Sequence, residues 1–94
     1  MDDKVCQIYA IAKGKVQRVG YRAFCVKQAT ELGLSGYAQN LPNGNVKILA
    51  EGQQSILRQY VTLLRKGPIL AKVNDVEFRW EEAEKVYFGF EIKI

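Results

Sequence analysis

One segment of the sequence has residue types that suit the binding of an anion. Residues 14–22, Gly-Lys-Val-Gln-Arg-Val-Gly-Tyr-Arg, lie between an apolar run and a helical pattern. Backbone N–H groups of a glycine-bearing turn can converge on one point, and the first turn of a helix adds partial positive charge. The guanidinium of Arg22 can hold two phosphate oxygens at once. These residues alone leave two interpretations open, an anion cradle or an ordinary turn with a solvated arginine.

A second segment supplies a neutral polar group. Residues 36–46 place Asn40 immediately before the turn sequence Leu-Pro-Asn-Gly. Asparagine is common at turns, and local sequence by itself favours that role. Its amide can also accept a hydrogen bond from water while donating one to an oxygen, so it can orient a nucleophile without titrating. Beside a bound phosphate, Asn40 would be able to place an attacking water.

The composition removes several kinds of catalysis. None of the 94 residues is histidine, which excludes Ser-His and Cys-His nucleophiles and the commonest zinc ligand. Cys6 and Cys25 lack the close spacing of a zinc site, and we expect them to be buried thiols. The net charge of +4 is uneven, because six basic residues precede Glu31, the first acid after Asp3. That field favours an anionic partner, either a phosphorylated metabolite or a nucleic acid.

The length and the ends of the sequence set further expectations. Ninety-four residues suit one domain spanning 1–94. No apolar stretch approaches the roughly 20 residues that a membrane helix needs, and the N-terminus lacks the basic and apolar parts of a signal peptide. We therefore expect a cytoplasmic protein without membrane association, and a monomer by default.

The apolar patterns predict strands and helices in a defined order. Residues 5–12 form an apolar run typical of a strand, and apolar residues at three- and four-residue spacing indicate a helix over about 21–32. Residues 34–39 and 45–50 flank a turn and indicate a hairpin. A second helix begins near Ser55, which we expect to cap it, and ends at Gly67-Pro68. Its apolar stripe consists of Leu57, Tyr60, Val61 and Leu64.

The last third of the chain returns to strand. Residues 72–80 and 86–94 carry strand-favouring side chains, separated by an acidic turn over 81–85. The order is βαββαβ, and the two strand-favouring runs at its end also allow the last element to be a hairpin of its own. Right-handed crossovers place both helices on one face of an antiparallel sheet. We therefore predict an α+β fold, a ferredoxin-like two-layer sandwich.

The two polar segments resemble the motifs of the acylphosphatase family, and the resemblance covers nearly the whole chain. The second segment matches the family pattern at Gly36, Tyr37, Ala38, Gln39, Asn40, Gly44, Val46 and Gly52. The first segment matches at Gly14, Val16, Gln17, Val19 and Arg22. It departs from the pattern at Arg18, where the family has glycine, at Tyr21, which replaces phenylalanine, and at Ala12, where a larger aliphatic residue is usual.

The resemblance implies a hydrolase acting on acid anhydrides, which cleaves small acyl phosphates into a carboxylate and inorganic phosphate. It implies Arg22 and Asn40 as catalytic residues, with Asn40 orienting the attacking water. The implied phosphate-binding residues are Gln17, Arg18, Val19, Gly20, Tyr21 and Arg22. No metal, no cofactor and no covalent intermediate are implied. The physiological acyl phosphate is left open.

The arginine at position 18 leaves alternative functions open. Glycine in a cradle can provide positive φ or close backbone approach, and arginine meets either demand poorly. Arg18 can instead add a second phosphate contact, or it can mark a catalytically weakened domain that senses phosphorylated metabolites. A single-stranded RNA-binding module is a further alternative, because residues 85–92, which include Tyr87, Phe88 and Phe90, are superficially similar to the aromatic signature of RNA-recognition domains. That signature belongs on the third strand, and the expected third strand has no aromatic residue.

Overall fold

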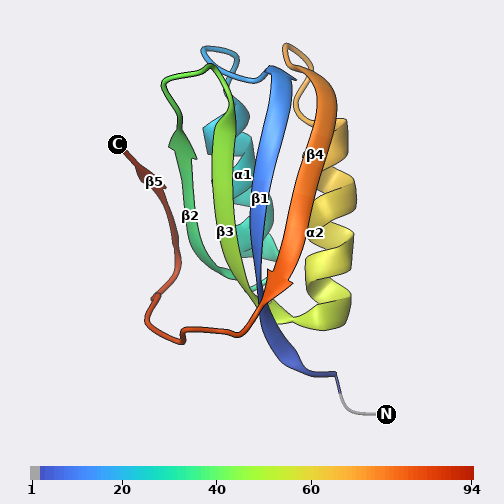
Figure 1. Ribbon diagram of the computed structural model, residues 1–94, viewed down its shortest axis with the longest axis vertical. Coiled ribbons are helices and arrows are strands. Elements are labelled where there is room, and N and C mark those ends of the chain that lie inside the picture. Colours follow the sequence, from blue (N-terminus) through green and yellow to red (C-terminus); the bar gives the residue numbers. More distant parts are fainter. Residues whose placement is uncertain (1–2) are drawn as a thin grey trace.

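The computed structural model describes residues 3–94, which form a five-stranded sheet with two helices on one face (Figure 1). The elements are β1 (Val5–Lys15), α1 (Tyr21–Glu31), β2 (Ser35–Asn40), β3 (Val46–Gln53), α2 (Gln54–Lys66), β4 (Lys72–Glu81) and β5 (Phe90–Lys93). The strand order is β4-β1-β3-β2-β5. The predicted ferredoxin-like sandwich is confirmed, because β1 to β4 form an antiparallel sheet in the βαββαβ order.

The fifth strand makes the sheet mixed. β5 pairs with β2 in parallel, with Gly36 opposite Phe90 and Ala38 opposite Ile92. The expectation of a wholly antiparallel sheet is therefore wrong at this edge. β4 and β5 also lie at opposite edges of the sheet, so the last element is no hairpin (Figure 1).

The segment between β4 and β5 explains this arrangement. Irregular backbone over residues 82–89 passes under the lower end of the sheet (Figure 1). It replaces most of the turn expected over 81–85 and the first part of the strand expected over 86–94, of which only residues 90–93 form a strand. Glu51, on β3, is only 7% exposed, and its carboxylate accepts hydrogen bonds from the N–H groups of Glu84 at 2.6 Å and Lys85 at 3.0 Å. The Glu51 carboxylate thus accepts backbone N–H groups that a strand would donate to a neighbouring strand. In this part of the chain only residues 90–93 pair with another strand.

β1 is longer than the sequence predicted and ends close to the site described below. The strand continues to Lys15 through an irregularity in its pairing with β4 at Gly14, which has a φ of 118°. A Cβ atom at this position would lie 2.2 Å from the carbonyl oxygen of Lys72, so the close approach of the two strands requires glycine. Gly14 therefore belongs to the sheet and not to an anion cradle.

The second helix buries the apolar stripe that the sequence predicted for it. Leu57, Tyr60, Val61 and Leu64 of α2 are all buried, while α1 buries Tyr21, Cys25 and Ala29. The expectation that Ser55 caps α2 is wrong, because Ser55 lies inside the helix and the N-cap residue is Gln53. The carboxylate of Asp3 accepts the Ser55 N–H at 3.1 Å and the Ser55 hydroxyl. A residue distant in sequence thus satisfies a free donor at this helix start.

Two buried tyrosines connect the helices across the core. The Tyr21 hydroxyl donates to the Leu64 carbonyl oxygen at 2.8 Å, and the Tyr60 hydroxyl donates to the Cys25 carbonyl oxygen at 2.8 Å. Burial raises the pKa of both tyrosines. Cys6 and Cys25 are free and buried, as predicted, and burial raises the pKa of the Cys25 thiol to about 12. Neither helix of residues 3–94 has the length and apolarity to cross a membrane.

Candidate active site

The two polar segments meet at one end of the sheet. The β1–α1 loop and the β2–β3 turn lie side by side at the upper end of the molecule in Figure 1. An open pocket of about 160 Å³ is lined there by Val16, Arg18, Gly20, Tyr21, Arg22, Ala23, Asn40 and Ile92. The pocket thus brings together Arg22 and Asn40, which are 18 positions apart in the sequence (40 − 22).

Gln17 holds the two segments together. Its side-chain Nε2 donates to the carbonyl oxygen of Leu41 at 2.8 Å and to that of Asn45 at 2.9 Å. Leu41 follows Asn40 directly, so the two bonds fix the end of β2 relative to the β1–α1 loop. The side chain of Gln17, which the resemblance placed among the phosphate-binding residues, is therefore engaged in positioning the turn. Only the backbone N–H of Gln17 is then left to donate a hydrogen bond to an anion in the loop.

The N-terminus of α1 forms one wall of the pocket. Gly20 is the N-cap residue with a φ of 77°, a left-handed conformation that glycine adopts without steric cost, and its carbonyl oxygen accepts the first helical bond from Phe24. The N–H groups of the first turn have no acceptor within a helix, and they carry the positive end of its dipole. Tyr21, Arg22 and Ala23 belong to this turn, which contains no acidic residue.

Arg18 occupies its position in the conformation that glycine favours. Its φ is 63°, a left-handed value that costs a residue with a Cβ atom about 1 kcal/mol or more. The loop therefore has the positive φ that a glycine there would provide, and the arginine is accommodated in it. The side chain is exposed, and Arg18 lines the pocket together with Arg22.

Val19 and Tyr21 have side chains committed to the core. Val19 packs against the buried cluster, and Tyr21 is buried with its hydroxyl bonded to Leu64. Of the predicted phosphate-binding residues, Arg18 and Arg22 thus provide charged side chains, while Val19, Gly20 and Tyr21 have only backbone to offer. No lining residue is acidic, so the pocket is strongly electropositive.

Asn40 has a polar atom that the surrounding protein leaves without a partner. Its Oδ1 is buried, and within residues 3–94 no donor reaches it. A buried amide oxygen without a hydrogen bond is costly, and such atoms are usually satisfied by water or a ligand. Asn40 is also one of the residues that line the pocket, so this unsatisfied amide belongs to a residue of the candidate site.

Ile92 is a pocket residue that the sequence did not indicate. It lies on β5, is 44% exposed and gives the pocket one apolar wall beside Asn40. The alternation of Phe90, Ile92 and Ile94 predicted a strand, but only the parallel pairing of β5 with β2 brings Ile92 to the site. No local signal in the sequence contains that information.

A larger open pocket of about 570 Å³ lies at the other end of the sheet. Lys4, Trp80 and Lys85 are among its lining residues, and neither Arg22 nor Asn40 contributes to it. Size alone therefore does not identify the reactive site, and the convergence of Arg22, Asn40 and a helix N-terminus is the better guide.

The fold and the pocket define a small α+β protein with an electropositive pocket at the start of a helix. The model of the acylphosphatase family matches residues 8–92. The acylphosphatase of Thermus thermophilus is 53% identical over 76 residues, covering 81% of this chain and 86% of that protein. The acylphosphatase of Dehalococcoides mccartyi is 53% identical over 85 residues, covering 89% and 93%.

Structural similarity agrees with the sequence comparisons. The crystal structure of acylphosphatase from Bacillus subtilis superimposes with a TM-score of 0.91 and 31% identity, covering 95% of this chain and 99% of that one. The chain belongs to the acylphosphatase family.

Proposed function

We propose that the protein hydrolyses the carboxyl–phosphate bond of small acyl phosphates, with Arg22 and the α1 N-terminus binding the phosphoryl group and Asn40 orienting the attacking water. One observation carries the assignment. A single pocket is lined by Arg22, by the free start of α1 and by Asn40, whose buried Oδ1 has no partner within residues 3–94. Membership of the acylphosphatase family supports the substrate class.

The chemistry needs little from the protein beyond position and charge. The water oxygen forms a bond to phosphorus while the bond from phosphorus to the acyl oxygen breaks, and its electron pair leaves with the carboxylate. The proton lost by the water ends on phosphate or in solvent. Because a carboxylate is a good leaving group, in-line attack requires an oriented water and stabilised phosphoryl oxygens.

Each group has a defined task in this mechanism. Arg22 and the N–H groups around Gly20 donate to the phosphoryl oxygens, and their field opposes the negative charge that accumulates there. Asn40 Oδ1 accepts a hydrogen bond from the water and so directs a lone pair at phosphorus. Gln17 is a positioning residue, because its two bonds to the β2–β3 turn set where Asn40 stands. A metal-independent reaction is proposed, since the lining residues include two arginines and no carboxylate that could bind a metal ion.

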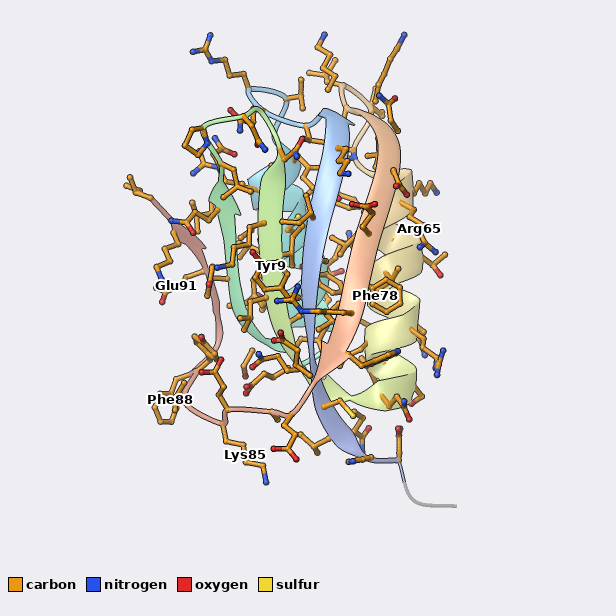
Figure 2. All side chains as sticks on the ribbon, viewed as in Figure 1. Tyr9, Arg65, Phe78, Lys85, Phe88 and Glu91 are labelled. Carbon is orange, nitrogen blue, oxygen red and sulfur yellow. The ribbon has the colours of Figure 1, made fainter. Side chains whose placement is uncertain are left out.

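An RNA-binding role is less well supported. Tyr9 lies on the sheet face turned away from the helices (Figure 2), with Arg79 4.3 Å and Lys47 5.0 Å from its ring centroid. Tyr37 is covered by Lys93 at 4.5 Å. These rings are occupied by the protein's own cations, and base stacking would have to displace them. β3 contains no aromatic residue.

We further propose a monomer that works in a reducing cytoplasm. The two cysteines are free and buried, which suits a compartment without disulfide formation. A single symmetric peak of about 11 kDa in sedimentation velocity, in agreement with a chain mass of 10.7 kDa, would support the monomer.

Hydrolysis of benzoyl phosphate in excess EDTA tests the proposed function. We expect chelator-resistant turnover by the wild type, little activity on a phosphate monoester, and loss of turnover in Asn40→Ala while inorganic phosphate still inhibits competitively. Asn74→Ala, on exposed β4, is the matched control and should behave as wild type. Phosphate binding without turnover in the wild type would favour the weakened, metabolite-sensing alternative.

A further inference from the structure

We infer that Arg18 recognises a second negative charge on the acyl portion of the substrate. The protein would then favour acyl phosphates whose acyl group carries a further anionic group, such as a carboxylate. This inference rests on the proposed function and adds a substrate class to it. It begins from an observation at the pocket, where two arginines, Arg18 and Arg22, stand beside a helix N-terminus.

The phosphoryl group has sufficient partners without Arg18. Arg22 lies in the first turn of α1, where it and the free N–H groups of that turn can surround one phosphoryl group. Arg18 comes two residues before the N-cap Gly20, on the exposed part of the loop. We place the phosphoryl group at Arg22 and the N–H groups of α1, and the acyl group towards the exposed residue Arg18, which lines the same pocket of about 160 Å³.

The charge of Arg18 is not neutralised by the protein. Within residues 3–94 the two ion pairs are Lys13 with Glu77 and Arg79 with Glu81, and neither involves Arg18. No acidic residue lines the pocket or occupies the first turn of α1. Arg18 has no ion-pair partner among the described residues, so its guanidinium is available to an anionic group of a bound substrate.

The backbone indicates that the arginine side chain has a use. The loop has a φ of 63° at Arg18, a conformation that glycine adopts more easily. Arginine is therefore unfavourable for the backbone here, and residues held in such conformations concentrate at functional sites. The contact proposed exists before and during the reaction, so it should lower KM and leave kcat nearly constant.

Two substrates of nearly equal shape isolate the effect. 4-Carboxybenzoyl phosphate carries an anion where 4-methylbenzoyl phosphate carries a methyl group. We expect wild-type kcat/KM to favour the carboxylated substrate by roughly two- to fivefold, the scale of an exposed ion pair. In Arg18→Gly that preference should fall to about one or below, through KM. Arg18→Lys should retain part of it, because the charge remains while the planar fork is lost.

Controls separate this role from the alternatives. Arg18→Gly suits the backbone, so loss of folding should not confuse the result. Lys27→Gln, on an exposed part of α1 outside the pocket, removes one charge and should keep the wild-type preference. A parallel fall for both substrates in Arg18→Gly, with weaker inhibition by inorganic phosphate, would place Arg18 on the phosphoryl group and overturn the inference.

The remaining outcomes are equally decisive. Equal wild-type kcat/KM for the two substrates, with no change in Arg18→Gly, would show a solvated side chain and overturn the inference while the proposed function stands. Failure of the wild type to hydrolyse either substrate would overturn the proposed function, and this inference with it.

Discussion

The side-chain amide of Gln17 donates a hydrogen bond to the carbonyl oxygen of Leu41 over 2.8 Å. This bond joins two segments. One is the β1–α1 loop, which contains Arg18 and leads to Arg22, and the other is the turn that follows Asn40. A second bond from the same nitrogen to Asn45 closes the contact. One neutral side chain thus ties the loop before Arg22, the proposed phosphate-binding residue, to the turn after Asn40, the proposed water-placing residue.

Gln17→Glu should separate the two parts of the site. The glutamate has nearly the same shape, but its carboxylate would face two carbonyl oxygens and could donate to neither. We expect kcat on benzoyl phosphate to fall at least about tenfold, since small misplacements of catalytic groups are expensive in rate, and stability to fall by about 1–3 kcal/mol. Gln59→Glu, on the exposed side of α2, is the control. Wild-type kcat in Gln17→Glu would contradict the positioning role.

Arg22→Lys tests the geometry of phosphate binding. The substitution keeps the charge and removes the planar fork that can hold two oxygens together. We expect kcat/KM to fall about 100-fold, the scale seen when one donor to a developing anion is lost, with weaker competitive inhibition by inorganic phosphate. Steady-state kinetics on benzoyl phosphate measure both effects. Near-normal constants would remove Arg22 from the site.

Tyr21→Phe should weaken the connection between the two helices. Leu64 lies near the end of α2, where carbonyl oxygens lack helical partners, and the Tyr21 hydroxyl supplies a buried donor to it. Its loss should cost about 1–2 kcal/mol of unfolding free energy, measured by urea denaturation. Tyr87→Phe removes an exposed hydroxyl and should change stability little. Equal changes in both variants would show that the buried bond contributes nothing particular.

The acid sensitivity of the protein should depend in part on Asp3. The side-chain hydroxyl and then the backbone N–H of Ser55 donate to its carboxylate and hold the pKa below its usual 3.8. A lowered folded-state pKa gives stability that is present above pH 3.8 and is lost as the pH falls through the folded value. Urea midpoints of Asp3→Asn should therefore lie below wild type at pH 5 and 7, and the gap should narrow progressively as the pH falls below 3.8. A constant gap across these pH values would contradict the linkage.

Much of the fold was predictable because its signals are local. The stripe of Leu57, Tyr60, Val61 and Leu64 occupies consecutive helical turns, and all four are buried as predicted. The β2–β3 hairpin follows from its turn residues. The position of β5 was not predictable, since it depends on Glu51 accepting the backbone of residues 84 and 85, more than 30 positions away. The cap that Asp3 provides for α2 was not predictable for the same reason, because Asp3 lies 52 positions from Ser55 in the sequence.

The candidate site also has a part that was predictable from local sequence and a part that was not. Arg22 and Asn40 were predicted as partners from motifs whose spacing survives in the sequence, and they line one pocket. The positive φ expected at the glycine position is present, although the residue is Arg18. The use of the Gln17 side chain and the presence of Ile92 were not predicted, because each depends on where a separate segment lies in space.

The parallel pairing of β5 with β2 sets an order of events during synthesis. Gly36 of β2 leaves the ribosome 54 residues before its partner Phe90 (90 − 36), an interval of roughly 3–10 s at typical elongation rates. Until then the outer edge of β2 is an unpaired strand that another nascent chain can extend. A ribosome stalled before β5 would therefore hold a nearly complete domain whose exposed edge invites association with its neighbours on the same messenger.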